Sequence, residues 1–130
     1  MCGILAAFCN NGVNTERLTK ATNLLAHRGP DAGGYFTSES KKVFLGHRRL
    51  SILDLSTTAN QPMHSSCGRY SIVFNGEVYN YQDIAKELLA DEPRLQFNTH
   101  SDTEVVLQSY IKWGVHCLPK WNGMFAAIIY

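Results

Sequence analysis

The chain has 130 residues, 45% of them hydrophobic and 18% charged, and its 12 basic and 11 acidic residues give a formal net charge of +1. This length suits one domain over residues 1–130, large enough to bury roughly two thirds of its unfolded surface. The small net charge gives no sign of a nucleic-acid or membrane partner. No apolar run approaches the roughly 20 residues of a membrane helix and no signal peptide is evident, so we expect a cytoplasmic protein.

The first elements expected are a strand and a helix. Residues 3–8 are apolar and predict a short buried strand. A helix is expected over residues 15–27, with Asn14 as its N-cap and one apolar stripe. Gly29, as a left-handed cap, and Pro30, which cannot continue a helix, are expected to end it.

Two strands and a long connection should follow. The strands are expected at residues 34–37 and 42–50, the second with alternating apolar and polar residues. The connection over residues 54–68 is polar and contains Gln61-Pro62-Met63. A loop of that length in a compact domain is more often functional than idle.

The dipeptide Asn75-Gly76 is the clearest local signal in the chain. It stands between two β-rich runs within residues 70–79 and predicts a hairpin turn, because both residues tolerate positive φ. Asn80 can then cap a helix over residues 81–90 that buries apolar side chains.

The last part of the chain predicts one more helix and one more strand. Ser101 and Glu104 form the pattern of a capping box, and Gly114 closes the helix that follows. The apolar residues 124–130 predict a buried strand. Because an apolar strand with no polar segment after it is unusual at a natural terminus, we expect the domain to be incomplete at this end.

Four cysteines and five histidines are scattered along the chain, with no C-x-x-C pair and no metal-ligand spacing. We therefore expect no metal site, and we interpret three of the cysteines as reduced thiols. A glycine-rich phosphate loop is also absent from the sequence.

The remaining cysteine, Cys2, follows Met1 directly. Met1 is generally removed when the next side chain is small, which would leave Cys2 with a free α-amine. A thiol with a pKa of about 8.5 and an amine with one of about 7.7 to 8.0 would then share one residue. Such a residue is a self-activated nucleophile. A small residue of the core remains the alternative for Cys2 taken alone.

Charged residues elsewhere suggest a substrate for this thiol. Arg48 and Arg49 face opposite sides of their strand, so only one of them can point into a given pocket. One guanidinium, together with the carboxylates of Glu77 and Asp102, would complement a free α-amino acid. Each of these residues could equally be a solvated side chain or a helix cap.

Asn75 and Gly76 have a second possible use. Acyl transfer through a thiol passes through an oxyanion, which needs hydrogen-bond donors fixed in advance. The Asn75 carboxamide and the Gly76 backbone N–H could supply two donors from one tight turn.

Six short motifs occur in order along the whole chain. They are Met1-Cys2-Gly3-Ile4, Arg28-Gly29-Pro30-Asp31, Gly46-His47-Arg48-Arg49-Leu50-Ser51-Ile52, Gln61-Pro62-Met63, Phe74-Asn75-Gly76-Glu77-Val78-Tyr79-Asn80 and Ser101-Asp102-Thr103-Glu104. In this order they resemble the class II glutamine amidotransferase domain, and more narrowly its glutamine-hydrolysing asparagine synthetase branch.

This resemblance implies an α+β fold, the N-terminal nucleophile hydrolase αββα four-layer sandwich, truncated at the C-terminus. It implies hydrolysis of L-glutamine to glutamate and ammonia. The implied roles are nucleophile for Cys2, oxyanion hole for Asn75 and Gly76, carboxylate binding for Arg49, ammonium binding for Glu77 and Asp102, and backbone contacts from Leu50 and Ile52. The loop Arg28-Gly29-Pro30-Asp31 is interpreted as structural support.

The resemblance also implies what lies outside these residues. No cofactor is expected in this domain, whereas ATP and Mg²⁺ are expected in a synthetase domain that would follow and use the ammonia to make asparagine from aspartate. A homodimer is a further expectation. The alternatives are transfer to another carboxylate, such as a sugar acid in polysaccharide biosynthesis, or a non-catalytic domain of the same fold.

Overall fold

A computed structural model gives the fold, and residues 2–51 and 56–130 are described. Of the site residues expected from the sequence, Ile52 lies outside the described residues, as does Met1. The elements are β1 (Gly3–Phe8), α1 (Thr15–Asn23), η1 (Leu24–His27), β2 (Ala32–Thr37), β3 (Val43–Arg49), η2 (Thr57–Ala59), β4 (Met63–His64), β5 (Ser71–Val78), α2 (Tyr81–Asp91), α3 (Asp102–Trp113), η3 (Gly114–Lys120) and β6 (Gly123–Ile129).

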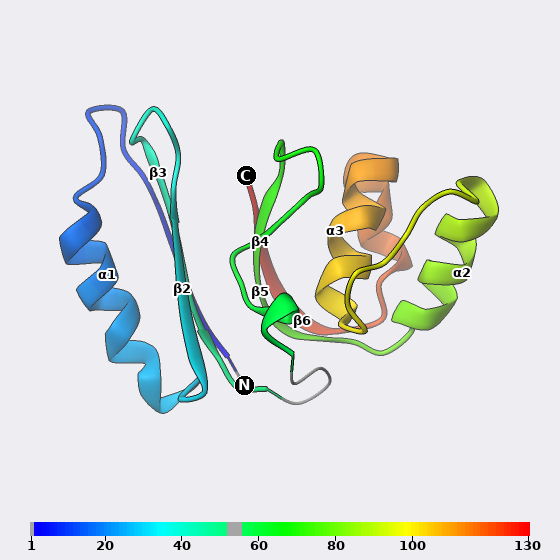
Figure 1. Cartoon of the computed structure of the whole chain (residues 1–130), viewed down its shortest axis with the longest axis horizontal. Coiled ribbons are helices and arrows are strands. Elements are labelled where there is room, and N and C mark those ends of the chain that lie inside the picture. The colour runs from blue at the N-terminus through cyan, green and yellow to red at the C-terminus, as the bar shows by residue number, and fades with distance from the viewer. Residues whose placement is uncertain (1, 52–55) are drawn as a thin grey trace.

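Two antiparallel sheets form the centre of the domain. The first has the strand order β1-β3-β2 and the second β4-β5-β6. Figure 1 shows α1 on the outer side of the first sheet, the second sheet facing its inner side, and α3 and α2 beyond the second sheet. Mixed helices with antiparallel sheets agree with the fold class expected from the sequence.

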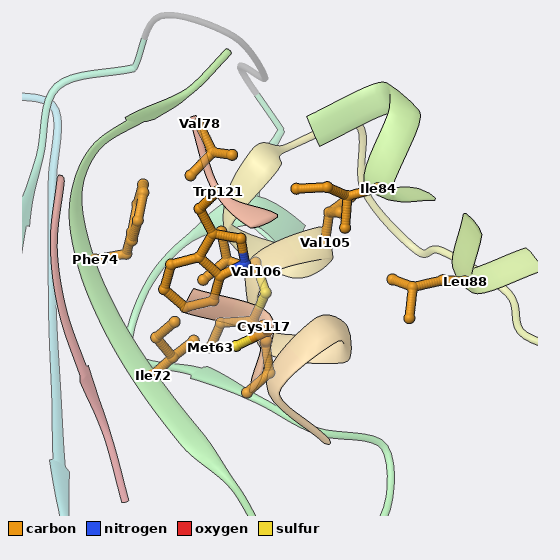
Figure 2. Packing of buried hydrophobic residues seen from close by; sticks show 11 residues of the cluster. Met63, Ile72, Phe74, Val78, Ile84, Leu88, Val105, Val106, Cys117 and Trp121 are labelled. Carbon is orange, nitrogen blue, oxygen red and sulfur yellow. The ribbon is translucent and has the colours of Figure 1, made fainter. Parts of the chain in front are cut away.

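The main hydrophobic core lies between the second sheet and the helices α2 and α3. Figure 2 shows Ile72 and Phe74 of β5 pointing toward Val106 of α3 and toward Trp121. The indole N–H of Trp121 donates to Ser109 Oγ at 3.0 Å, so its one polar group is satisfied inside the core. This packing holds β5 against the start of α3.

The strands at the sheet edges are less buried than the sequence suggested. In β1 only Gly3 is buried and Phe8 is 70% exposed, because β1 has a neighbour on one side only. In β6, Met124 is 70% exposed for the same reason. Strands were therefore correctly predicted in both places, but their burial was not.

Strand β3 departs from the predicted alternation. Its residues Phe44–His47 are all buried, whatever side they face. Helix α1 covers one face, where a Cβ on Gly46 would lie 2.2 Å from Thr22 Oγ1, and the second sheet covers the other. A central strand covered on both faces is buried on both, so the expected alternation of buried apolar and exposed polar residues was wrong.

The start of α1 agrees with prediction and its end does not. The Arg17 N–H donates to Asn14 Oδ1 at 2.9 Å, which confirms the N-cap. Gly29 is not a left-handed cap, since the described glycines with positive φ are Gly12, Gly68, Gly76 and Gly114. A Cβ on Gly29 would lie 2.3 Å from the Arg48 carbonyl oxygen, so glycine is needed there for close approach of two backbones.

The two later helix caps are also different from the expectation. Asn80 precedes α2, but its side chain accepts from Asn122 N–H at 2.9 Å and donates to the Lys120 carbonyl at 2.9 Å. Glu104 accepts hydrogen bonds from Asn98 and Thr99 instead of returning to Ser101. The side chains of Asn80 and Glu104 thus bind neighbouring loops and do not cap a helix. The predicted capping box was wrong, although α3 begins where it was expected.

The predicted hairpin at Asn75-Gly76 does not exist. Both residues lie inside β5, where Asn75 pairs with Ala126 and Gly76 with Phe125 of β6. Gly76 does have a positive φ of 140°, and a Cβ there would lie 2.1 Å from the Met124 carbonyl oxygen. The glycine is therefore required by the strand itself, which bends against β6 without turning back.

Candidate active site

Cys2 directly precedes β1 and lies beside Leu50, the residue that follows β3. The pairing of Gly3 with Arg48 brings Cys2 to this end of the sheet. Its Sγ accepts from the Leu50 N–H at 3.4 Å and donates to the Leu50 carbonyl at 3.7 Å. Cys2 is half-buried, so the core alternative for this residue is not what the structure shows.

The loop Arg28-Gly29-Pro30-Asp31 holds both chain segments at the thiol. Arg28 Nε donates to the Cys2 carbonyl at 3.1 Å, and Asp31 Oδ2 accepts from the Ser51 N–H at 2.7 Å. The Asp31 N–H also donates to the Arg49 carbonyl at 3.0 Å. These contacts are with backbone groups, which agrees with a supporting role for the loop.

A cavity of about 260 Å³ opens beside Cys2. Six of the residues expected from the sequence line it: Cys2, Arg49, Leu50, Gly76, Glu77 and Asp102. Asn75 is not among the described residues that line the cavity, although its neighbour Gly76 is. The chain thus brings residues up to 100 positions apart to one place.

Arg49, and not Arg48, faces the cavity. Its guanidinium is buried, with 8% of the residue exposed, and donates from one nitrogen to the Ser56 carbonyl and to Asn60 Oδ1, both at 2.7 Å. Arg48 lies on the opposite face of β3 and donates to the Gly29 carbonyl at 3.1 Å. The alternation expected along the strand therefore assigns one arginine to each face.

Two carboxylate residues, Glu77 and Asp102, also line the cavity. Asp102, the first residue of α3, is 5% exposed, and its Oδ2 accepts from the Val78 N–H at 3.0 Å. Burial raises the pKa of Asp102 above its ordinary value, and the charge of Glu77 adds to this rise, while hydrogen bonds from the backbone of Val78 and Thr103 oppose it. Such a pair of carboxylates would be stabilised by a bound cation.

Asn75 and Gly76 lie in the second half of β5, where Gly76 lines the cavity and Asn75 is its direct neighbour. The Oδ1 atom of Asn75 is buried and has no hydrogen-bond partner among residues 2–51 and 56–130. A buried polar atom without a partner is costly and invites a functional explanation. Any donors for an oxyanion therefore come from a strand, and not from the tight turn that the sequence suggested.

Several cavity residues were not proposed from the sequence. Gln61, Ser101 and Thr103 line the cavity and are all buried. Ser101 Oγ finds no hydrogen-bond partner within the described part of the chain. The motifs Gln61-Pro62-Met63 and Ser101-Asp102-Thr103-Glu104 indicated that these segments belong to the site. Which of their side chains line the cavity depends on the packing of β5 against α3, which the sequence does not reveal.

His47 is a buried titratable group next to the site. It is 1% exposed, and this burial is the main cause that lowers its pKa to about 4. The positive charges of Arg49 and Arg48 lower the pKa further, whereas a hydrogen bond with the Phe74 backbone raises it. The ring is therefore neutral near pH 7.

No helix among residues 2–51 and 56–130 is long and apolar enough to cross a membrane. The structure is a mixed α/β domain in which one thiol, one guanidinium and two carboxylate residues line a single cavity. The family model of the glutamine amidotransferase domain matches residues 1–130, and the chain belongs to this family of enzymatic domains.

Curated relatives agree with this assignment. The chain is 41% identical to glutamine-hydrolysing asparagine synthetase 1 of Bacillus subtilis and 39% identical to an amidase of Gibberella zeae, in both cases over its whole length. It is 35% identical, again over its whole length, to a putative glutamine-hydrolysing asparagine synthetase of Methanocaldococcus jannaschii. The chain spans 21% of the length of the first two relatives and 28% of the third. It is therefore a glutamine amidotransferase domain homologous to part of the asparagine synthetases.

Proposed function

We propose that this domain hydrolyses L-glutamine to glutamate and ammonia through a thioester on Cys2. The observation that carries the proposal is the composition of one cavity, whose lining includes Cys2, Arg49 and the carboxylate residues Glu77 and Asp102. A free amino acid offers one carboxylate and one ammonium to such a site, and its side chain is left to reach the thiol.

Recognition of the substrate follows from charge. Arg49 binds the α-carboxylate, while Glu77 and Asp102 bind the α-ammonium, with backbone groups of Leu50 and Ile52 assisting. Binding of the ammonium also favours the charged form of Asp102, whose pKa is raised in the free site. We therefore expect the cavity to bind a zwitterionic amino acid more tightly than a neutral amide that lacks the α-ammonium and α-carboxylate groups.

The chemistry begins once Met1 has been removed. The α-amine of Cys2 takes the thiol proton, directly or through a water, and Sγ bonds to the side-chain amide carbon of glutamine. The oxyanion that forms accepts hydrogen bonds from the Asn75 carboxamide and the Gly76 N–H. The protonated amine then gives its proton to the leaving nitrogen, the carbon–nitrogen bond breaks, and ammonia departs.

The second half of the reaction restores the enzyme. Water attacks the thioester carbon and loses a proton to the α-amine, and the carbon–sulfur bond breaks. The thiolate regains its proton and glutamate is released. The contact between Cys2 Sγ and the Leu50 N–H supports the thiolate at both stages.

The layer order seen in Figure 1, helix, sheet, sheet, helices, supports the N-terminal nucleophile hydrolase sandwich as the complete fold. In the full-length protein we expect the ammonia to amidate a carboxylate that ATP has activated, with aspartate as acceptor and asparagine as product. ATP, Mg²⁺ and any homodimer contact belong to that protein, and no step in this domain uses them. A cytoplasmic location fits this chemistry.

Another acceptor is the second candidate. One relative with 39% identity is named an amidase and not an asparagine synthetase, so the name asparagine synthetase is not shared by all relatives. The alternative for the transfer step is a different carboxylate, such as a sugar acid. The glutaminase step is the same in both cases.

A glutaminase assay on the full-length protein tests the proposal. Glutamate should be released from L-glutamine without ATP, and ATP with aspartate should convert ammonia to asparagine. Asparagine formation absent with aspartate but amidation present with a sugar acid would support the second candidate. No glutamate release under either condition would contradict the glutaminase assignment.

A further inference from the structure

Gln61 joins two elements of the proposed site through its carboxamide. Its Oε1 accepts from the Phe74 N–H of β5 at 2.6 Å, and its Nε2 donates to Thr103 Oγ1 of α3 at 3.3 Å. The residue is 8% exposed and lines the cavity. We propose that Gln61 is a positioning residue that holds the oxyanion-binding strand and the ammonium-binding helix at a fixed separation, an inference that rests on the proposed glutaminase function.

The hydrogen bond between the Gln61 side chain and the Phe74 N–H takes the place of one that a longer strand β4 would make. Strand β4 pairs with β5 only at Met63–Ile72 and His64–Ser71, so it ends before it reaches Phe74. A buried N–H without a partner is costly, and the Gln61 side chain provides the acceptor that a longer β4 would have supplied. The oxygen end of the carboxamide is thereby fixed on β5, and its nitrogen end must face α3.

The two residues that Gln61 binds are direct chain neighbours of proposed site residues. Phe74 immediately precedes Asn75, and Thr103 immediately follows Asp102. A shift of the carboxamide therefore moves the oxyanion donors relative to the carboxylate that binds substrate. Placement errors of about 1 Å can cost on the order of 10²-fold in rate.

The backbone of Gln61 is itself tightly held. A Cβ on Gly34 of β2 would lie 2.0 Å from the Gln61 carbonyl oxygen, so the first sheet packs directly on it. The preceding residue, Asn60, accepts a hydrogen bond from Arg49 at 2.7 Å. One short segment thus contacts Arg49 directly and the chain neighbours of Asn75 and Asp102, while taking part in no chemical step itself.

Four variants of the full-length protein test this inference by steady-state glutaminase kinetics. Gln61→Met keeps the length of the side chain and removes both hydrogen bonds, and we expect kcat to fall about 10- to 100-fold. Thr103→Val removes only the second bond and should cost about tenfold in kcat or kcat/KM, the size of one neutral hydrogen bond. Thr103→Ser keeps the hydroxyl and should behave like wild type.

The fourth variant, Gln61→Met with Thr103→Val, separates bridging from general destabilisation. If Gln61 links the two elements, the double variant should be no worse than Gln61→Met alone, because the second bond is already lost. Ser109→Ala is the matched control, since Ser109 makes buried hydrogen bonds on α3 but is not among the described residues that line the cavity. This change should lower stability and leave kcat within about twofold of wild type.

The outcomes are distinct. Wild-type kcat in folded Gln61→Met, or additive losses in the double variant, would overturn the inference while the glutaminase assignment stands. If Gln61→Met does not fold, Thr103→Val compared with Thr103→Ser decides the question, and equal kcat and KM in these two would overturn it. No glutaminase activity in wild type would overturn the proposed function and this inference together.

Discussion

The Sγ atom of Cys2 lies 3.4 Å from the Leu50 amide nitrogen and 3.7 Å from the Leu50 carbonyl oxygen. The thiol is thus positioned by main-chain groups of the residue that follows β3, which the antiparallel pairing of β1 with β3 brings alongside. The side chain of residue 50 does not set this contact. These contacts orient the proposed nucleophile before substrate binds.

Loss of the Asn75 carboxamide should lower kcat more than it raises KM. Asn75→Ala and the isosteric Asn75→Asp both remove the proposed donor, and removal of one oxyanion donor costs roughly 10²- to 10³-fold in kcat. Asn80→Ala is the matched amide control, because the Asn80 side chain binds backbone groups of Lys120 and Asn122 away from the cavity. A change confined to KM in the Asn75 variants would count against the assigned role.

Arg49→Ala should mainly weaken glutamine binding and so raise KM. The guanidinium also binds the Ser56 carbonyl and Asn60 Oδ1, so some loss of stability is expected as well. Arg48→Ala removes the arginine on the opposite face of β3 and should leave KM near the wild-type value. The reverse pattern, with KM raised only by the Arg48 change, would move the carboxylate contact to Arg48.

Asp102 should make the folded domain less stable as pH rises. Its pKa is raised in the folded state, so the stabilisation is fully present below the ordinary value of 3.8 and is lost as pH rises through the higher folded value. Asp102→Asn removes this titration and should be at least as resistant to heat as wild type at pH 7, while its KM for glutamine rises. Thermal unfolding of both proteins from pH 3.5 to 7 checks the predicted effect on stability. An unfolding temperature of the variant below that of wild type at pH 7 would show that the Asp102 carboxylate stabilises the folded domain.

His47 should have the opposite effect in an overlapping range. Because its folded pKa is lowered from 6.5 to about 4, its contribution to stability is present above 6.5 and is lost as pH falls through about 4. His47→Gln keeps a polar side chain that does not titrate. We expect its unfolding temperature to fall less than that of wild type between pH 6.5 and 4, and parallel curves would exclude His47 as the cause.

The sequence predicted most elements and six of the thirteen residues that line the cavity. Its errors in secondary structure fall mainly where one local pattern can serve two purposes. Asn75-Gly76 carries a hairpin signal because glycine accepts positive φ, yet Gly76 uses that freedom inside β5, where the Met124 carbonyl leaves no room for a Cβ. Ser101 and Glu104 have capping-box spacing, but Glu104 instead accepts from the loop at Asn98 and Thr99.

The contribution of Gln61 could not be predicted from the sequence for a different reason. Its two partners, Phe74 and Thr103, are 13 and 42 residues away, and only the packing of β5 against α3 brings them within reach of one carboxamide. Charge drew attention to Glu77 and Asp102, and strand alternation limited the cavity to one of Arg48 and Arg49, because a strand face and a helix start are local features. The choice of Arg49 came from the resemblance to the amidotransferase motifs.

The most direct measurement is the mass of the full-length protein, acid-quenched during turnover of L-glutamine and mapped by peptide analysis. We expect the N-terminal peptide to begin at Cys2, without Met1, and a fraction of it to carry a glutamyl group on Sγ that is absent from Cys2→Ala. The Cys2→Ala protein should remain folded and release no glutamate. Retention of Met1 in active enzyme would exclude the Cys2 amine as base, and glutamate release by Cys2→Ala within tenfold of the wild-type rate would contradict Cys2 as the nucleophile.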